Sequence, residues 1–150
     1  MAMYFYTNLQ DELKIPDDCC VFSCVACNLE KLPDLPTSLK LLNCCDNKLS
    51  ELPVLPNSIQ GLNCSGNKLF ELPKLPNLLT ELYCCDNELF ELPELPMTLK
   101  KIWCQNNNIK YLSPNNCDVI KKCNDIKVLN NPFSTGFTNS NDFKEYLMNL

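Results

Sequence analysis

The sequence predicts a repeat solenoid that is mainly β, with an extended, polyproline-like convex side and short helical caps. Three observations support this fold. Leucine and proline recur with a period of 20 residues through most of the 150-residue chain. Each repeat contains a Leu-x-Cys alternation, which has the period of a strand, and two Leu-Pro pairs, which disfavour a helix. We therefore expect one domain, residues 1–150, built from about six coils.

Four copies of the repeat align without gaps. Leucine or isoleucine stands two residues before each cysteine of the repeat and two residues after each asparagine. The aligned cysteines are Cys44, Cys64, Cys84 and Cys104, and the aligned asparagines are Asn47, Asn67, Asn87 and Asn107. This many matched columns indicates a true structural repeat, in which each coil stacks on the one before.

Each repeat contains a strand, a bend and a return segment. The alternation at Leu42-x-Cys44 predicts a short strand that points both side chains inward. The asparagine ends the strand, since its amide both donates to and accepts from backbone groups at a bend. The two Leu-Pro pairs then favour an extended return leg with its leucines in the core.

The N-terminal end continues the series imperfectly. Phe22 and Cys24 match the strand columns, whereas Cys27 replaces the asparagine and offers the bend a weak donor. We therefore assign residues 15–133 to the repeats. Because a solenoid exposes its apolar cross-section at each end, a cap is required there. The apolar spacing within residues 1–13 predicts a short amphipathic helix, so residues 1–14 are assigned to the N-terminal cap.

The C-terminal end departs from the 20-residue spacing. The last coil follows after 24 residues, and the extra segment 115–122 predicts a short helix with Asn116 as its cap and Val119 and Ile120 inside. Residues 134–150 are assigned to a C-terminal helical cap that begins at Asn141. The predicted inner face of that helix is Phe143, Tyr146, Leu147 and Leu150.

The composition excludes several functions. The chain has 12 cysteines, no histidine, no arginine and a net charge of −5. Without histidine there is no Ser-His-Asp triad, no Cys-His pair and no Cys₂His₂ zinc finger. The negative charge argues against binding a nucleic-acid backbone, and no apolar run reaches the roughly 18 residues of a membrane span. We expect no enzyme activity, no cofactor, and neither a nucleic acid nor a membrane as partner.

The cysteines allow more than one interpretation. Thiols in neighbouring coils lie within reach of disulfide bonding, but a narrow coil needs small buried side chains, which favours simple packing. The first residues lack the pattern of a secretory signal, so we expect free thiols in the cytoplasm. Cys24-x-x-Cys27 has metal-ligand spacing without a second pair nearby, so no metal site is predicted. The alternative function is a thiol-rich metal-binding or redox protein.

The outward side chains of the strands define a candidate binding surface. Strands stacked side by side form a curved sheet whose exposed face is concave. Tyr83 and Trp103 are neighbours on it, and aromatic residues are enriched at binding hot spots. The alternative is that these two rings stack on each other and stiffen the sheet. The predicted binding residues are Leu41, Asn43, Cys45, Asn63, Glu81, Tyr83, Cys85, Lys101, Trp103 and Gln105.

The unit Leu-Pro-x-Leu-Pro-x-x-Leu-x-x-Leu-x-Cys-x-x-Asn-x-Leu resembles the short leucine-rich repeats of bacterial secreted effectors, the Yersinia outer protein M and IpaH type. Similar repeats occur in proteins of large DNA viruses. The resemblance implies a leucine-rich-repeat horseshoe that binds a host or cellular protein through its concave face, in the host cytosol. In the effector ligases a catalytic domain follows the repeats. About 17 residues follow the last coil here, so we expect a non-enzymatic, monomeric interaction module.

Overall fold

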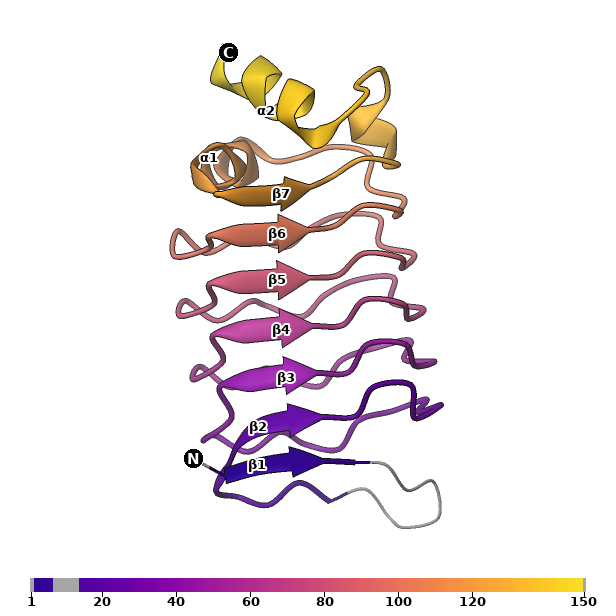
Figure 1. Cartoon of the computed structure of the whole chain (residues 1–150), viewed down its shortest axis with the longest axis vertical. Helices are drawn as coiled ribbons and strands as arrows, with labels where there is room; N and C mark the ends of the chain where they lie inside the picture. The colour runs from indigo at the N-terminus through magenta and orange to yellow at the C-terminus, as the bar shows by residue number, and fades with distance from the viewer. Residues whose placement is uncertain (1, 7–13, 150) are drawn as a thin grey trace.

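The computed structural model describes residues 2–6 and 14–149 and places them in a stacked solenoid (Figure 1). Seven parallel strands follow one another in chain order in a single sheet. They are β1 (Ala2–Phe5), β2 (Cys19–Ser23), β3 (Leu41–Asn43), β4 (Gly61–Asn63), β5 (Glu81–Tyr83), β6 (Lys101–Trp103) and β7 (Asp125–Lys127). From β2 to β6 equivalent residues pair at steps of 20, with Leu42 beside Leu62 and Leu82 beside Ile102. The predicted solenoid of about six coils, here β2 to β7, is confirmed.

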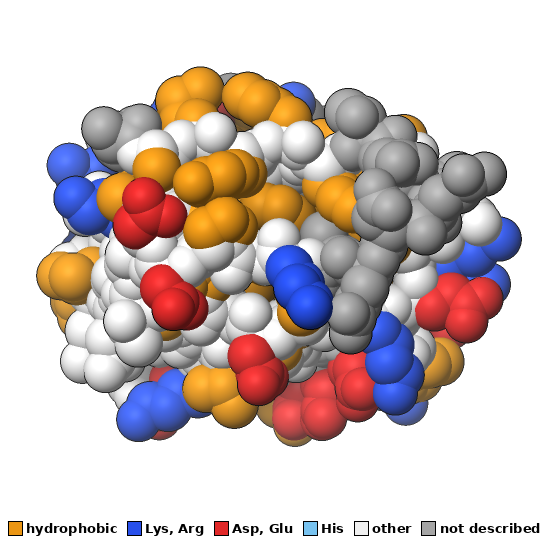
Figure 2. Space-filling model, turned by 90° about the horizontal axis from the view of Figure 1, so that it is seen from below, with side chains coloured by type: hydrophobic (Ala, Val, Ile, Leu, Met, Phe, Trp, Pro, Cys, Tyr) orange, Lys and Arg blue, Asp and Glu red, His pale blue; other side chains and the backbone are white. Residues whose placement is uncertain are grey.

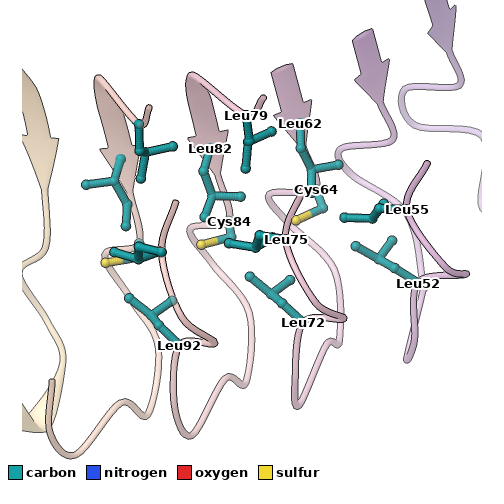
Figure 3. Close-up of a cluster of buried hydrophobic side chains, with 14 of the residues drawn as sticks. Leu52, Leu55, Leu62, Cys64, Leu72, Leu75, Leu79, Leu82, Cys84 and Leu92 are labelled. Carbon is teal, nitrogen blue, oxygen red and sulfur yellow. The ribbon is translucent and has the colours of Figure 1, made fainter. Parts of the chain in front are cut away.

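The core lies between the strands and the return segments. Cys24, Cys44, Cys64, Cys84 and Cys104 form the predicted inward ladder and have no exposed surface. In Figure 3 the sulfur atoms of Cys64 and Cys84 point into the space between strand leucines and return-segment leucines such as Leu75. All twelve cysteines are free thiols. A cysteine fits this column because the Leu-Pro segment brings the opposite wall of the coil close to the strand.

A ladder of buried asparagines holds one coil to the next. The Nδ2 group of Asn87 donates to the carbonyls of Cys64, one coil earlier, and Cys84, in its own coil, at 3.0 and 3.3 Å. Its Oδ1 accepts from the backbone N–H of Leu69 at 3.0 Å. Asn47, Asn67, Asn107 and Asn131 make the equivalent bonds. The asparagine therefore binds backbone groups at the bend, as predicted, and it also bonds to backbone groups of the neighbouring coil.

A second ladder runs along the turn before the strands. The hydroxyl of Ser58 donates to the carbonyls of Thr37 and Leu39, at 2.7 and 2.6 Å. Ser38 and Thr98 repeat this pattern in their own coils. Leu78 stands in the same column, is 53% exposed and has no hydroxyl to donate. The ladder is therefore interrupted in one coil.

We expect Leu78→Ser to stabilise the protein. The single proton of the new hydroxyl would be shared between the carbonyls of Asn57 and Ile59, as in its counterparts one coil away, and the net hydrogen bond contributes about 1 kcal/mol. Thermal unfolding should shift upward by about 3 °C. Thr98→Ala is the matched control, because it removes the equivalent shared hydrogen bond and should lower the melting temperature by a similar amount. An unchanged or lower melting temperature for Leu78→Ser would contradict this account.

The N-terminal end differs from the prediction. Residues Ala2–Phe5 form β1, which pairs in parallel with β2 and sets Met3 opposite Val21. The predicted amphipathic helix is wrong there, since the open sheet edge has unpaired backbone groups that a strand satisfies and a helix does not. The rest of that helix prediction, residues 7–13, lies outside the described residues. Figure 2 views the molecule from this end and shows hydrophobic side chains exposed among charged ones.

Helix α1 (Pro114–Lys122) occupies the predicted insertion. Its cap is Ser113, whose Oγ accepts from the backbone N–H of Asn116 at 3.2 Å. The prediction of Asn116 as the cap is wrong, because its side chain is buried and binds backbone groups of the preceding return segment. Val119 and Ile120 are buried as predicted.

Helix α2 (Ser140–Met148) covers the C-terminal end beyond a 3₁₀ turn at Pro132–Ser134 (Figure 1). Asn139, not the predicted Asn141, is its cap, because the Oδ1 of Asn139 accepts from the Asn141 backbone N–H at 2.9 Å. Phe143 and Leu147 are buried as predicted.

Two further predictions for this end have other outcomes. Tyr146 is half exposed, and its ring lies 5.3 Å from that of Phe137. Leu150 lies outside the described residues. Among the helices that are described, none has the length and apolar character to cross a bilayer.

Candidate functional site on the concave face

The strands present two rows of outward side chains on the concave face. The first row is Val21, Leu41, Gly61, Glu81, Lys101 and Asp125, and the second is Ser23, Asn43, Asn63, Tyr83, Trp103 and Lys127. Successive residues of a strand alternate between faces, so these rows flank the buried row of Leu62 and its equivalents. Every predicted site residue in these two rows is exposed or half-buried.

A third row lies just past the strand ends. Cys45 and Gln105 are half-buried there. Cys85 was predicted as an exposed contact residue, but only 8% of it is exposed, and its thiol donates to Ser65 Oγ at 3.1 Å. The prediction for Cys85 is corrected accordingly, because the backbone leaves strand geometry after Tyr83 and the alternation no longer holds.

An aromatic and charged cluster occupies the part of the face formed by β5, β6 and β7. The rings of Tyr83 and Trp103 meet edge to face, with centroids 4.9 Å apart and planes at 81°. Lys127 Nζ lies 3.4 Å from the centroid of the Trp103 ring. The Tyr83 hydroxyl donates to Glu81 Oε2 at 3.1 Å, and Lys101 Nζ pairs with Glu81 Oε1 at 3.0 Å. The two rings therefore contact each other, as the alternative interpretation expected, and remain partly exposed.

The cluster keeps its charges at neutral pH. The hydrogen bond to Glu81 raises the pKa of Lys101, so the ammonium form is held. Burial, followed by the hydrogen bond to Glu81, raises the pKa of Tyr83, so the phenol stays neutral. The face thus presents an ion pair and a fixed hydroxyl beside two aromatic rings.

Two hollows flank the Tyr83 side chain. The first has a volume of about 350 Å³ and an apolar wall that includes Phe5, Val21 and Leu41. Its floor includes Gly61, where an added Cβ would come within 2.8 Å of a Leu41 methyl carbon. The Leu41 side chain therefore leans over Gly61, where only a glycine leaves room for it, and the hollow lies beside it.

The second hollow has a volume of about 330 Å³ and is more polar. The indole of Trp103, the thiols of Cys45 and Cys85 and the carboxylate of Asp46 line it. Asp46 has a φ of 58°, a left-handed conformation that aspartate and asparagine tolerate better than most residues. Tyr83 and Asn63 line both hollows and form the wall between them.

Two polar atoms beside the second hollow have no hydrogen-bond partner among the described residues. They are Nε1 of Trp103 and Oε1 of Gln105, and both atoms are buried. Each unpaired buried group costs on the order of 1–3 kcal/mol. Trp103 and Gln105 thus retain one donor and one acceptor that the fold does not use.

The thiols on this face are poor nucleophiles. Burial, followed by the charge of Asp46, raises the pKa of Cys45 to about 11, and burial also raises the pKa of Cys85. Since the thiolate is the reactive form, both groups are protonated at neutral pH. Within residues 2–6 and 14–149, no three side chains of the metal-ligating types gather closely enough to hold an ion. The geometry is that of a recognition surface.

Several residues of this surface were not among the predicted binding residues, including Gly61, Lys127, Asp46 and Phe5. Gly61 and Lys127 stood in the predicted outward rows, and the lone glycine among larger side chains was a detectable signal. Asp46 lies past the strand end, where side chains no longer alternate between the two faces of the sheet. Phe5 was missed because its segment was expected to be helical rather than to extend the sheet.

Comparison with known proteins supports the fold. No family model matches the chain, and no curated protein matches it. Among solved structures, the chain is similar to a Shigella effector leucine-rich-repeat domain, with 36% identity, a TM-score of 0.64 and 69% of this chain covered. It is also similar to YopM from Yersinia enterocolitica and to the leucine-rich effector YopM from Yersinia pestis. Both are 29% identical over 79% of this chain, with TM-scores of 0.58 and 0.63. The match spans 46%, 30% and 40% of those chains.

Proposed function

Because the chain is a leucine-rich-repeat solenoid of the short type found in the Shigella and Yersinia effectors, we propose that it is a non-enzymatic protein-interaction module. The proposed surface is the concave face. The observation that carries the proposal is the cluster of Tyr83, Trp103 and the Glu81–Lys101 ion pair on β5 and β6 of that face.

This part of the face combines features of a protein-binding hot spot. Aromatic anchors that are already fixed lose little conformational entropy on binding. Tyr83 is fixed by its bond to Glu81, and Trp103 is held between Tyr83 and Lys127. Hollows on either side of Tyr83 give a partner places to insert side chains. These features suit a protein partner better than a reaction, because no activated nucleophile lies among them.

We extend the proposal to the setting in which the module acts. Effector-like repeats favour a cellular host protein as partner, in the host cytosol, for a bacterial or viral protein. A net charge of −5 disfavours nucleic acid as the partner. The module is proposed to act as a monomer, and its free thiols suit a reducing compartment.

The proposal predicts that the aromatic pair is required for partner capture. Wild type and a Tyr83→Ala/Trp103→Ala double variant would be immobilised and exposed to a eukaryotic cell lysate, and the bound proteins quantified by mass spectrometry. We expect one or a few proteins to bind wild type and to fall at least about tenfold in the variant, as for loss of a hot spot. Val54→Ser/Met97→Ser, which changes exposed side chains in the return segments, is the matched control and should retain capture. Equal recovery by wild type and the aromatic variant would remove the assigned surface.

A further inference from the structure

The two hollows beside Tyr83 differ in chemistry, and this difference indicates what kind of segment fits them. The first is lined mainly by hydrocarbon, with a glycine in its floor. The second contains a carboxylate and an indole ring. Resting on the proposed function, we propose that the concave face binds an extended segment that inserts a bulky apolar side chain over Gly61 and a lysine or arginine beside Asp46 and Trp103.

The apolar position follows from the row that contains Gly61. Its neighbours Leu41 and Glu81 both carry long side chains. A Leu41 methyl carbon reaches the space that a side chain at residue 61 would take, so the partner side chain would pack beside Leu41 in the hollow. The volume of about 350 Å³ is at the low end of small-ligand sites and holds one large hydrophobic side chain. Leu41 is 44% exposed, and Phe5 is 67% exposed. Covering these side chains would remove apolar surface from water.

The basic position follows from charge complementarity. Asp46 is exposed at the rim, and no lysine is paired with it among the described residues. The Trp103 ring already attracts one cation, since Lys127 Nζ lies 3.4 Å from its centroid. Because Lys127 already occupies that ring, the exposed carboxylate of Asp46, which no lysine pairs with, is the group that attracts a basic residue from the partner.

The distance between the two hollows determines how far apart the apolar and basic residues of the partner segment must be. Gly61 and Ser65, which line the first and second hollows, are four residues apart along one coil. At about 3.3 Å per residue of extended chain this corresponds to about 13 Å. A partner in extended conformation would therefore carry its apolar and basic residues about four positions apart.

The test is selection of peptides on the intact protein. A random 12-residue library displayed on phage would be selected on wild type, and the recovered peptides would be synthesised with a fluorophore for anisotropy titrations. We expect a shared pattern of one aromatic or large aliphatic residue and one lysine or arginine three to five positions away. Changing either residue of the peptide to alanine should weaken binding about tenfold.

Two variants of the protein test whether the peptide occupies the two hollows. Gly61→Leu fills the first hollow with the residue that the preceding coil already carries, and should weaken binding at least about tenfold. Asp46→Asn keeps the shape and tolerates the left-handed backbone, and should weaken binding about fivefold, less so at high salt. Circular dichroism and melting temperatures near those of wild type would show that both variants are folded.

The outcomes distinguish failure of this inference from failure of the proposed function. Peptides that bind Tyr83→Ala/Trp103→Ala as well as wild type would contradict the concave surface itself. Peptides that need the two aromatic residues, yet lack the apolar and basic pattern or bind both hollow variants normally, would overturn only the inference. Failure to select any peptide would also overturn it, because the segment proposed here is short enough to be present in the library.

Discussion

Raising the pH from 8 to 10 under reducing conditions should lower the free energy of unfolding by about 7 kcal/mol. The reason is the buried five-cysteine ladder, whose first member, Cys24, has a pKa that burial raises to about 12. Burial raises the pKa of Cys64 and Cys104 to about 12 and raises those of Cys44 and Cys84 well above the ordinary value of 9.0. Unfolded thiols therefore lose their protons at a lower pH than folded ones.

The sign and size follow from proton linkage. Because the folded pKa values are raised, the stabilisation is complete below pH 9 and is lost as the pH rises toward 12. One pH unit above 9, each ladder thiol contributes about 1.4 kcal/mol in favour of the unfolded chain, and five contribute about 7 kcal/mol. A loss of this size is comparable to the total stability of many domains.

The measurement is urea unfolding at pH 8, 9 and 10 in the presence of a phosphine reductant. Cys64→Ala is the control, because removal of one of the five ladder thiols should reduce the ladder's contribution to the pH slope above 9 by about a fifth, even where it lowers stability overall. A slope that is flat between pH 8 and 10, or unchanged in Cys64→Ala, would contradict the buried, protonated ladder.

Asn87→Ala should be the most damaging single change in the central coils, lowering the free energy of unfolding by about 4 kcal/mol. The side chain binds the backbone N–H of Leu69 and the carbonyls of Cys64, Cys84 and Cys85. Alanine leaves these groups buried without a partner, and each orphaned group costs on the order of 1–3 kcal/mol. The loss affects two coils at once, because two of the four partners belong to the preceding coil.

Asn77→Ala is the matched control for this prediction. Asn77 has an exposed side chain in the preceding coil, and the same substitution there should change stability by no more than about 0.5 kcal/mol. Both variants would be compared with wild type by urea unfolding at pH 7. Similar stabilities for the two variants would show that the asparagine ladder does not hold the coils together.

Much of the fold could be predicted because the same residue types recur at the same positions in every coil. The inward position of Cys64, the bend at Asn67 and the extended Leu-Pro segment each follow from local chemistry that recurs every 20 residues. A wrong secondary-structure assignment in one coil would disagree with the assignments of the equivalent residues in the other coils. The period therefore determined the strand register as well as the fold class.

The ends and the rim of the site could not be predicted in this way. At Ala2–Phe5 the same apolar residues suit an amphipathic helix or an edge strand, and the open edge of the sheet decides between them. At Asn116 the capping preference was outweighed by tertiary hydrogen bonds to the preceding coil. Cys85 and Asp46 lie beyond the strand ends, where alternation no longer reports which way a side chain points.

The most direct test of the account is site-specific photo-cross-linking of the captured partner. A benzophenone amino acid would be placed either at Asn63, which lines both hollows of the concave face, or at Val54, which is 87% exposed on a return segment. Both proteins would be irradiated in the same eukaryotic lysate. We predict one dominant cross-linked partner from Asn63, lost when Tyr83 and Trp103 are changed to alanine, and none from Val54. The same partner cross-linked from Val54 and not from Asn63 would contradict recognition by the concave face.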